Sequence, residues 1–382
     1  MVGILEGIRV LDLTQYQAGP VCTTWLGDLG ADVIKIEAPW GDPFRATWMA
    51  KGMSVYFMAV NRNKKSICLN LRDERGLKIF KELVKHSDVV VNNYAPGTME
   101  RLGIGYKTLK EINPQIIFAS ISGFGQYGPY RERLSFDIIA QAMSGYMTIT
   151  AQSATATTGV TDIPPVLVTD AIGDTFPGTV CALAIIAALY HRQRTGVGQE
   201  IDVSQLDSMV YLLSPSLVSY MLVGSTIPEL RMKAPPGAYG LYKAKDRYVA
   251  IGAAPALMDR LAEVIGLKSV DAEKVKEWVK DKTAAEIEKL LVEGRVPVGI
   301  VREANEVLEC PQILARDMVV EVEHPQYGKI KLIGFPIKLS ETPGKIEIPP
   351  PSVGQHTEEV FSTILGYSRE EVAKLREDGV VK

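Results

Sequence analysis

The chain has 382 residues, of which 46% are hydrophobic and 23% charged, a composition ordinary for a globular protein of one or two domains. The 42 basic and 45 acidic residues leave a formal net charge of −3, which disfavours a nucleic-acid or membrane-surface protein. The four cysteines are far apart and form no CxxC pair, so we expect reduced, mostly buried thiols in an intracellular protein: Cys22, Cys68, Cys181 and Cys310.

The first third of the chain is predicted to alternate strands and helices. Buried, β-rich runs are expected at 7–14, 32–37, 66–70, 88–92 and 116–122, with helices at 20–29 and 74–86. This succession predicts a mostly parallel sheet with helices on both faces. No GxGxxG follows the first run, so the Rossmann-like pattern gives no support for a nicotinamide cofactor.

The middle of the chain is predicted to be apolar and helical. Helices are expected near 137–146, 176–193 and 202–213. The strongest apolar run, 178–190, is too short for a bilayer span and is typical of a buried helix. The start of the chain lacks a cationic segment followed by an apolar one, so no signal peptide is predicted and we expect a cytoplasmic protein.

A Pro- and Gly-rich stretch at 224–240 separates this helical part from the remainder. The sequence KAPPGAY at 233–239 within it is typical of an active-site loop and equally of a linker. A hairpin at 241–252, a charged helical segment at 271–293, a strand at 298–301 and a helix from about 357 are expected beyond it. The fold is therefore predicted as α/β: a large Rossmann-like domain with a parallel sheet (1–225), a smaller α+β domain (226–338) and a return to the large domain (339–382).

Few residues indicate catalysis by themselves. The histidines lack the spacing of metal ligands, and no GxSxG suggests a serine hydrolase, so no metal site is predicted: His86, His191, His324 and His356. The NRNKK turn at 61–65 could hold a phosphate, but a solvated basic turn is the commoner case.

Asp170 stands in VTDAIGDT, directly before the apolar helix. The ordinary role of such a residue is an N-cap, whose side chain accepts a hydrogen bond from an amide of the first turn. The same position would keep a carboxylate ionised and able to attack a thioester. The pattern by itself favours the cap.

Longer stretches of the chain resemble the class III CoA-transferases, the family that contains formyl-CoA transferase and the α-methylacyl-CoA racemases. The similar segments are VLDLTQYQAGPVCTTWLGDLGADVIKIEAP at 10–39, NRNKKSICLNLRDERG at 61–76, VNNYAPGTMERLGIGY at 91–106, SISGFGQYGPY, FDIIAQAMSG, the stretch from Thr169 through TGVGQEIDVSQLDSMV, and PSVGQHTEEV. Their order along nearly the whole chain makes the resemblance specific. It implies a large Rossmann-like and a small domain in a homodimer of interlinked rings. It also implies acyl-CoA and small carboxylic acids as substrates, with no permanently bound cofactor.

The resemblance also implies residue roles. Asp170 matches the nucleophilic aspartate, Asp137 an acidic position beside it, and Gln17 and Ala18 the thioester region, where an amide could stabilise an oxyanion. CoA-contacting positions are matched by residues 69–72, which include Leu69 and Arg72, and by Asn93, Tyr94, Ala95, Arg101 and Phe136. Arg72 and Arg101 are the expected phosphate contacts. Ala38 stands where the family often has Arg, and Arg45 could supply that cation.

Two positions favour the transferases over the racemases. Epimerisation needs a base on each side of the α-carbon, and racemase relatives carry His and Glu where this chain has Phe136 and Pro255. The function predicted from the resemblance is CoA transfer from an acyl-CoA donor to a carboxylic acid, through aspartyl anhydride and aspartyl-CoA thioester intermediates on Asp170. An α-methylacyl-CoA racemase, or a non-catalytic CoA-binding subunit of a heteromeric transferase, remain the alternatives.

Overall fold

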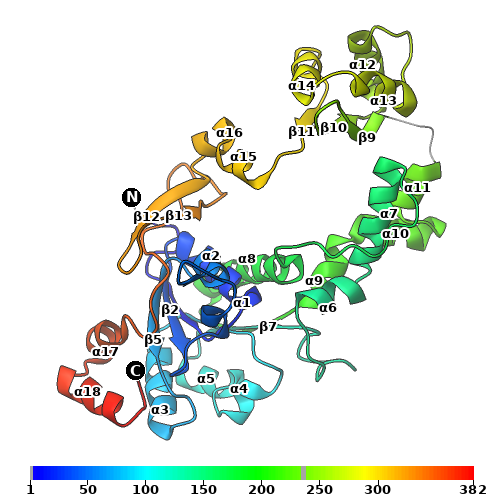
Figure 1. Ribbon diagram of the computed structural model, residues 1–382. Helices are drawn as coiled ribbons and strands as arrows, with labels where there is room; N and C mark the ends of the chain where they lie inside the picture. The colour runs from blue at the N-terminus through cyan, green and yellow to red at the C-terminus, as the bar shows by residue number, and fades with distance from the viewer. Residues whose placement is uncertain (1–2, 234–237) are drawn as a thin grey trace. The chain divides into compact units, whose positions relative to one another are not determined.

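The computed structural model describes residues 3–233 and 238–382, which form two compact units. The first unit contains Met1–Ser144, Val168–Tyr211 and Gln312–Lys382, and the second contains Gly145–Leu167 and Leu212–Pro311. The chain therefore leaves the first unit twice and returns to it twice, as the colours of Figure 1 show.

A parallel sheet forms the centre of the first unit (Figure 1). Its six strands are, in spatial order, β5 (Lys64–Cys68), β2 (Asp32–Glu37), β1 (Arg9–Asp12), β6 (Val89–Asn92), β7 (Ile117–Ser122) and β8 (Glu200–Ser204). All neighbouring pairs are parallel. The chain adds β2 and β5 on one side of β1 and β6 to β8 on the other, so the order reverses between β1 and β6. Ligands of open α/β sheets bind at the carboxyl ends of the strands beside such a reversal.

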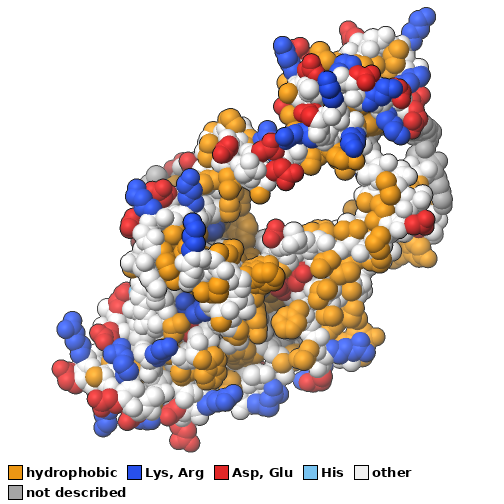
Figure 2. Space-filling model, in the orientation of Figure 1, with side chains coloured by type: hydrophobic (Ala, Val, Ile, Leu, Met, Phe, Trp, Pro, Cys, Tyr) orange, Lys and Arg blue, Asp and Glu red, His pale blue; other side chains and the backbone are white. Residues whose placement is uncertain are grey.

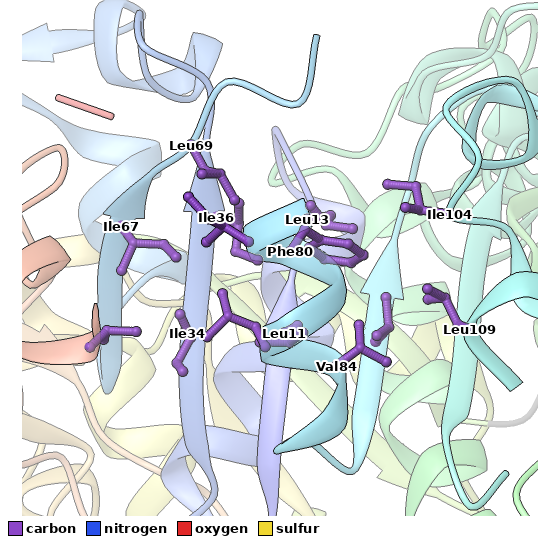
Figure 3. Packing of buried hydrophobic residues seen from close by; sticks show 14 of the residues in the cluster. Leu11, Leu13, Ile34, Ile36, Ile67, Leu69, Phe80, Val84, Ile104 and Leu109 are labelled. Atoms are coloured by element: carbon purple, nitrogen blue, oxygen red, sulfur yellow. The ribbon is translucent and has the colours of Figure 1, made fainter. Parts of the chain in front are cut away.

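Each face of the sheet has its own hydrophobic core, because successive side chains of a strand point to opposite sides. One core contains Leu11 of β1, Ile34 of β2 and Phe80 of α3 (Glu74–Lys85), and Figure 3 shows these side chains within the buried cluster. The other core contains Val10 and Val33 from the alternate positions of the same strands.

Helices α1 (Ala18–Asp28) and α8 (Ile172–Thr195) cover this second face. They approach closely at Gly178, where a Cβ atom would lie 2.4 Å from the carbonyl oxygen of Ala18. By length and composition α8 could cross a membrane, but 44% of its apolar window is buried inside the protein. The contact with α1 identifies α8 as a core helix of the first unit.

The second unit contains an antiparallel sheet in the order β11 (Val298–Ile300), β10 (Tyr248–Ala253), β9 (Ala238–Lys243). Three helices share a hydrophobic core with this sheet: α12 (Met258–Ile265), α13 (Ala272–Lys280) and α14 (Ala284–Glu293). Helix α7 (Tyr146–Thr158) packs against α11 (Ile227–Lys233) and β9. This packing is why 145–167 groups with the second unit rather than with the expected domain at 1–225.

The remaining elements are short. In the first unit they are η1 (Pro43–Ala46), β3 (Met49–Ala50), β4 (Met53–Ser54), α2 (Val55–Val60), α4 (Thr98–Arg101), α5 (Tyr106–Ile112), α6 (Asp137–Met143), β12 (Val319–His324), β13 (Gly328–Ile333), α17 (Thr357–Leu365) and α18 (Arg369–Glu377). In the second unit they are α10 (Ser214–Val223), η2 (Pro255–Leu257) and α15 (Ala304–Leu308), while α9 (Gln205–Leu212) and α16 (Pro311–Ala315) cross the unit boundaries.

The α/β class, the parallel sheet and the smaller antiparallel sheet agree with expectation. Two predicted helices are corrected. Residues 202–204 belong to strand β8, because they pair with β7, so the helix expected at 202–213 begins at Gln205. The segment 271–293 is two helices, because Thr283 and Glu286 form a capping box that starts α14. Residues 234–237 of the expected loop lie outside the described part of the chain.

Candidate active site

Gln17 lies at the carboxyl end of β1, at the N-cap position of α1, and its side chain is buried. Its Nε2 donates hydrogen bonds to Thr175 Oγ1 at 3.0 Å and to the carbonyl oxygen of Asp170 at 3.3 Å. Thr175 Oγ1 also donates to that carbonyl, at 3.3 Å. Close packing of α1 on α8 thus brings together the expected nucleophile and the expected thioester-contacting residue, which are far apart in sequence.

Asp170 itself has an exposed side chain and a left-handed backbone conformation, with φ of 57°. Ala171 follows with φ of 50°, and it occupies the N-cap position of α8. Such conformations cost about 1–3 kcal/mol for a non-glycine residue and persist only where surrounding contacts hold them. Among residues 3–233 and 238–382, no hydrogen bond or ion pair engages the Asp170 carboxylate.

Asp137 supplies the cap that the sequence pattern assigned to Asp170. Its Oδ1 accepts a hydrogen bond from the backbone amide of Gly173, in the first turn of α8, at 2.7 Å. Gln141, one turn further along α6, donates to both Asp137 oxygens at 2.9 Å. The N-cap interpretation of Asp170 is therefore wrong, because a carboxylate from another helix already satisfies this amide.

Gln141 also fixes the chain before Asp170. It is fully buried, and its amide group donates to the carbonyl oxygen of Val168 at 2.9 Å and accepts from the amide of Val168 at 3.0 Å. The segment 168–173 is thus held on both sides of Asp170. Sequence reasoning missed Gln141 and Thr175; the one available signal was that Gln141 stands four residues after Asp137, on the same helix face.

Asp174 adds a second carboxyl group to the first turn of α8. Burial raises its pKa to about 7 and the negative charge of Asp137 adds to the rise, while a hydrogen bond from Gln205 opposes it. This carboxyl group therefore changes its charge near neutral pH beside the expected nucleophile.

The two expected phosphate contacts are exposed arginines that follow β5 and β6, two strands separated in the sheet by β2 and β1. Arg72 follows β5, with its guanidinium 5.8 Å from the ring centre of Trp40. Arg101 ends α4 after β6 and donates to Thr98 Oγ1 at 2.8 Å. Within the described ranges, neither guanidinium forms an ion pair. Both charges are free to meet an anion.

The other expected CoA contacts differ in accessibility. Ala95 is exposed, Tyr94 is half-buried and burial raises its pKa to about 12. Leu69 is 1% exposed and belongs to the core shown in Figure 3, so its side chain is unavailable to a ligand. Asn93 holds the backbone of Gln15, with its Oδ1 accepting from the amide at 2.8 Å and its Nδ2 donating to the carbonyl at 2.7 Å.

Comparisons with known proteins give this geometry its context. The model of CoA-transferase family III matches residues 5–357. The chain belongs to CoA-transferase family III. It is 34% identical to the succinyl-CoA–D-citramalate CoA-transferase of Chloroflexus aurantiacus, over 99% of this chain and 98% of that one. It is 36% identical to the succinyl-CoA:glutarate CoA-transferase of Mus musculus, over 99% and 90%.

A solved structure agrees with these sequences. The fold superimposes on a CAIB/BAIF family protein from Brucella suis with a TM-score of 0.82 and 31% identity, over 95% of this chain and 100% of that one. The chain is a class III CoA-transferase, an enzyme that transfers CoA between an acyl-CoA and a carboxylic acid.

Phe136 directly precedes Asp137, at the N-cap position of α6, and is 59% exposed. Tyr16 contacts it edge-to-face with ring centres 5.8 Å apart, and Tyr16 contacts Phe44 in the same way at 5.3 Å. The Phe136 ring has no group that exchanges a proton, so this residue offers an apolar contact rather than the base that epimerisation needs.

The structure argues against phosphate binding by Arg45 and by the basic turn at 61–65. Arg45 makes a bidentate ion pair with Glu37, at 2.7 Å for each contact, and donates to the carbonyl of Pro351 at 2.9 Å. All three guanidinium nitrogens are thus used, which argues against a phosphate contact in place of the family arginine. The turn at 61–65 is neither solvated nor open to phosphate, because Arg62 and Lys64 are buried in ion pairs with Asp28 and Asp12.

Proposed function

We propose that Asp170 is the covalent nucleophile of this CoA-transferase. The observation that carries the proposal is the free, exposed carboxylate at the start of α8, with the backbone on both sides of it held by other residues. A carboxylate used only as a helix cap would be bound to the amides of α8. Here Asp137 takes that role, so the Asp170 oxygens are left for chemistry.

The reaction then proceeds by four acyl transfers. An Asp170 oxygen attacks the thioester carbonyl of the donor and expels CoA thiolate, which leaves an aspartyl–acyl anhydride. The thiolate attacks the Asp170 carbonyl of the anhydride, giving aspartyl-CoA thioester and the donor acid. The acceptor carboxylate displaces the thiolate and forms a second anhydride. The thiolate finally attacks the acceptor carbonyl, which yields the new acyl-CoA and restores the Asp170 carboxylate.

Each attack develops negative charge on a carbonyl oxygen, which amide donors stabilise. Both hydrogen-bond contacts of the Gln17 side-chain nitrogen go to Thr175 and the Asp170 carbonyl in the free enzyme. Ala18 is the first residue of α1, and its backbone amide has no acceptor within the helix. We therefore assign Gln17 to holding the nucleophile and the Ala18 amide, at the positive end of the helix, to the oxyanion.

Arg72 and Arg101 are proposed to bind CoA phosphates, because both follow strands of the sheet, β5 and β6, and neither forms an ion pair with another described residue. Small carboxylic acids are the proposed acceptors. The named relatives from Chloroflexus aurantiacus and Mus musculus use succinyl-CoA. We propose succinyl-CoA as the first donor to test.

A homodimer is proposed from the exposed hydrophobic side chains. On α8, Leu183 and Tyr190 are 68% and 62% exposed, and on α10, Met221 and Leu222 are 75% and 77% exposed. Figure 2 shows hydrophobic side chains at the surface of the chain. Large apolar side chains exposed on each unit are typical of interaction surfaces, so a second copy is the proposed cover. Light scattering during size exclusion measures the mass directly.

A cytoplasmic location is proposed from the cysteines. Cys22, Cys68 and Cys181 are free, buried thiols, as in proteins of reducing compartments.

The test of the nucleophile compares wild type with Asp170→Asn. Succinyl-CoA is mixed with a panel of mono- and dicarboxylic acids, and new thioesters are measured by mass spectrometry. We expect turnover only with Asp170 present, hydroxylamine trapping at the Asp170 peptide, and CoA binding unchanged in the variant. Turnover by Asp170→Asn above about 1% of wild type would reject the nucleophile. Deuterium incorporation at the α-carbon without an acceptor would instead support the racemase alternative.

A further inference from the structure

A set of charged side chains is buried beneath the carboxyl edge of the sheet, outside the site described above. Asp12, Lys35 and Lys64 are 0% exposed and Asp42 is 3% exposed. Lys35 Nζ lies 2.9 Å from Asp42 Oδ2, and Lys64 Nζ lies 3.1 Å from Asp12 Oδ2. Buried ion pairs are weak sources of stability, because desolvation offsets their attraction. These ion pairs are therefore expected to have a role other than stabilising the fold, and their further hydrogen bonds indicate one.

Those contacts converge on the turn that follows β1. Lys35 Nζ donates to the carbonyl of Thr14 at 2.8 Å, and Asp12 Oδ1 accepts from the Thr14 amide at 2.8 Å. Asp42 Oδ1 accepts from the amide of Tyr16 at 3.2 Å and from that of Phe44 at 2.9 Å. Asn93 binds the backbone of Gln15, between Thr14 and Tyr16. Each residue from 14 to 16 is thus held by the side chain of another residue of the first unit.

The turn needs this support at Tyr16. Its φ is 61°, a left-handed conformation that non-glycine residues adopt only when neighbouring contacts impose it. The next residue is Gln17, whose side chain holds the carbonyl of Asp170. A relaxation of Tyr16 would therefore turn Gln17 away from the nucleophile.

We infer that Asp42, held by Lys35, is a positioning residue for CoA transfer, which fixes Tyr16 in its left-handed conformation so that Gln17 orients Asp170. The inference rests on the proposed role of Asp170. Asp42 contacts neither Asp170 nor Gln17 by its side chain in the structure; it acts through the backbone amide of Tyr16.

The test compares Asp42→Ala, Asp42→Asn and Asp28→Asn in the full-length enzyme. Asp42→Ala removes the acceptor for Tyr16, whereas Asp42→Asn keeps an oxygen in its place. Asp28→Asn is the matched control: it disturbs another buried ion pair, with Arg62, at the far end of α1. Steady-state kinetics gives kcat and KM, calorimetry gives the Kd for CoA, and thermal unfolding gives Tm.

We expect Asp42→Ala to lower kcat at least 30-fold, with KM and the Kd for CoA changed less than threefold. Asp42→Asn should recover most of this loss, and Asp28→Asn should lower Tm with kcat within twofold of wild type. If Asp42→Ala does not fold, Lys35→Met, which has a similar volume, is judged by the same criterion.

Wild-type kcat in the folded Asp42→Ala enzyme, or a loss of kcat in Asp28→Asn as large as in Asp42→Ala, would overturn the positioning role. Asp170→Asn is assayed beside these variants. If it is inactive while Asp42→Ala keeps kcat, only the positioning role is wrong. If Asp170→Asn is active, the proposed nucleophile itself is wrong.

Discussion

The carboxylate of Asp137 accepts a hydrogen bond from the backbone amide of Gly173 at 2.7 Å, across 36 positions of sequence. This contact caps α8 with a residue of α6, so the Asp170 carboxylate is not needed as a cap and binds no other described residue. The Asp170 carboxylate is thus free because a different acid, Asp137, binds the helix amide.

Removal of this cap is expected to affect both stability and catalysis. Asp137→Ala leaves the Gly173 amide and the Gln141 side chain without their acceptor, at a cost of about 1 kcal/mol in the free energy of unfolding. The freed amide also attracts the Asp170 carboxylate, so kcat should fall about tenfold or more. Chemical denaturation and steady-state kinetics measure the two effects. Asp137→Asn keeps one acceptor oxygen and should lose less of each; equal kcat in both variants would contradict the account.

Asp174 gives the enzyme a predictable pH dependence of stability. Its folded-state pKa, raised by burial to about 7, lies above its ordinary value of 3.8, so the folded state binds the proton more tightly. The protonated Asp174 carboxyl group therefore contributes fully to the free energy of unfolding below about pH 4, and this contribution is lost as the pH rises to about 7. Asp174→Asn keeps an oxygen for Gln205 and cannot ionise. We expect the unfolding free energy of Asp174→Asn relative to wild type to be about 1–2 kcal/mol higher at pH 8 than at pH 5, after allowance for partial exposure. Thermal unfolding at the two pH values should show the same direction in Tm. An equal difference at both pH values would refute this assignment.

Arg72 and Arg101 should contribute to CoA binding rather than to the chemical steps. Arg72→Ala and Arg101→Ala are each expected to raise KM for acyl-CoA about 5- to 30-fold, as for the loss of a charge-assisted contact of about 1–2 kcal/mol, with kcat within about threefold. The effect should shrink at high salt. Arg75→Ala is the control, because Arg75 is an exposed arginine already paired with Asp73 and Asp378. A KM as high in this control would show a general charge effect instead.

Thr175 is expected to act through Gln17. Thr175→Val preserves shape but removes the oxygen that accepts from Gln17 and the hydroxyl that donates to the Asp170 carbonyl. We predict a fall in kcat of about tenfold, with near-normal KM, and recovery in Thr175→Ser. The measurement compares kcat and KM of Thr175→Val, Thr175→Ser and wild type, with one acyl-CoA donor and one acceptor acid. A valine variant with full kcat would show that the hydroxyl is dispensable.

Much of the fold was predictable from local patterns. Strand β2 was expected at its observed limits, and the helix expected at 74–86 is α3, one residue shorter. Buried apolar runs and helical periodicity are properties of a few consecutive residues, so they can be recognised without knowing which strand or helix packs against them. Strand β8 was missed at 202–204 because its polar sequence, EIDVS, becomes a strand only through pairing with β7.

The sequence by itself determined the alternation of strands and helices and, through the resemblance, the family and the position of Asp170. Only the tertiary structure decided that Asp170 is free, because its competitor for the helix amide, Asp137, reaches α8 from another helix. It also decided that Gln17 meets Thr175, 158 positions away, since the packing of α1 on α8 brings the two together. Hydrogen-bond partners at such separations depend on which faces of helices and sheets pack together, and a local sequence pattern does not show this.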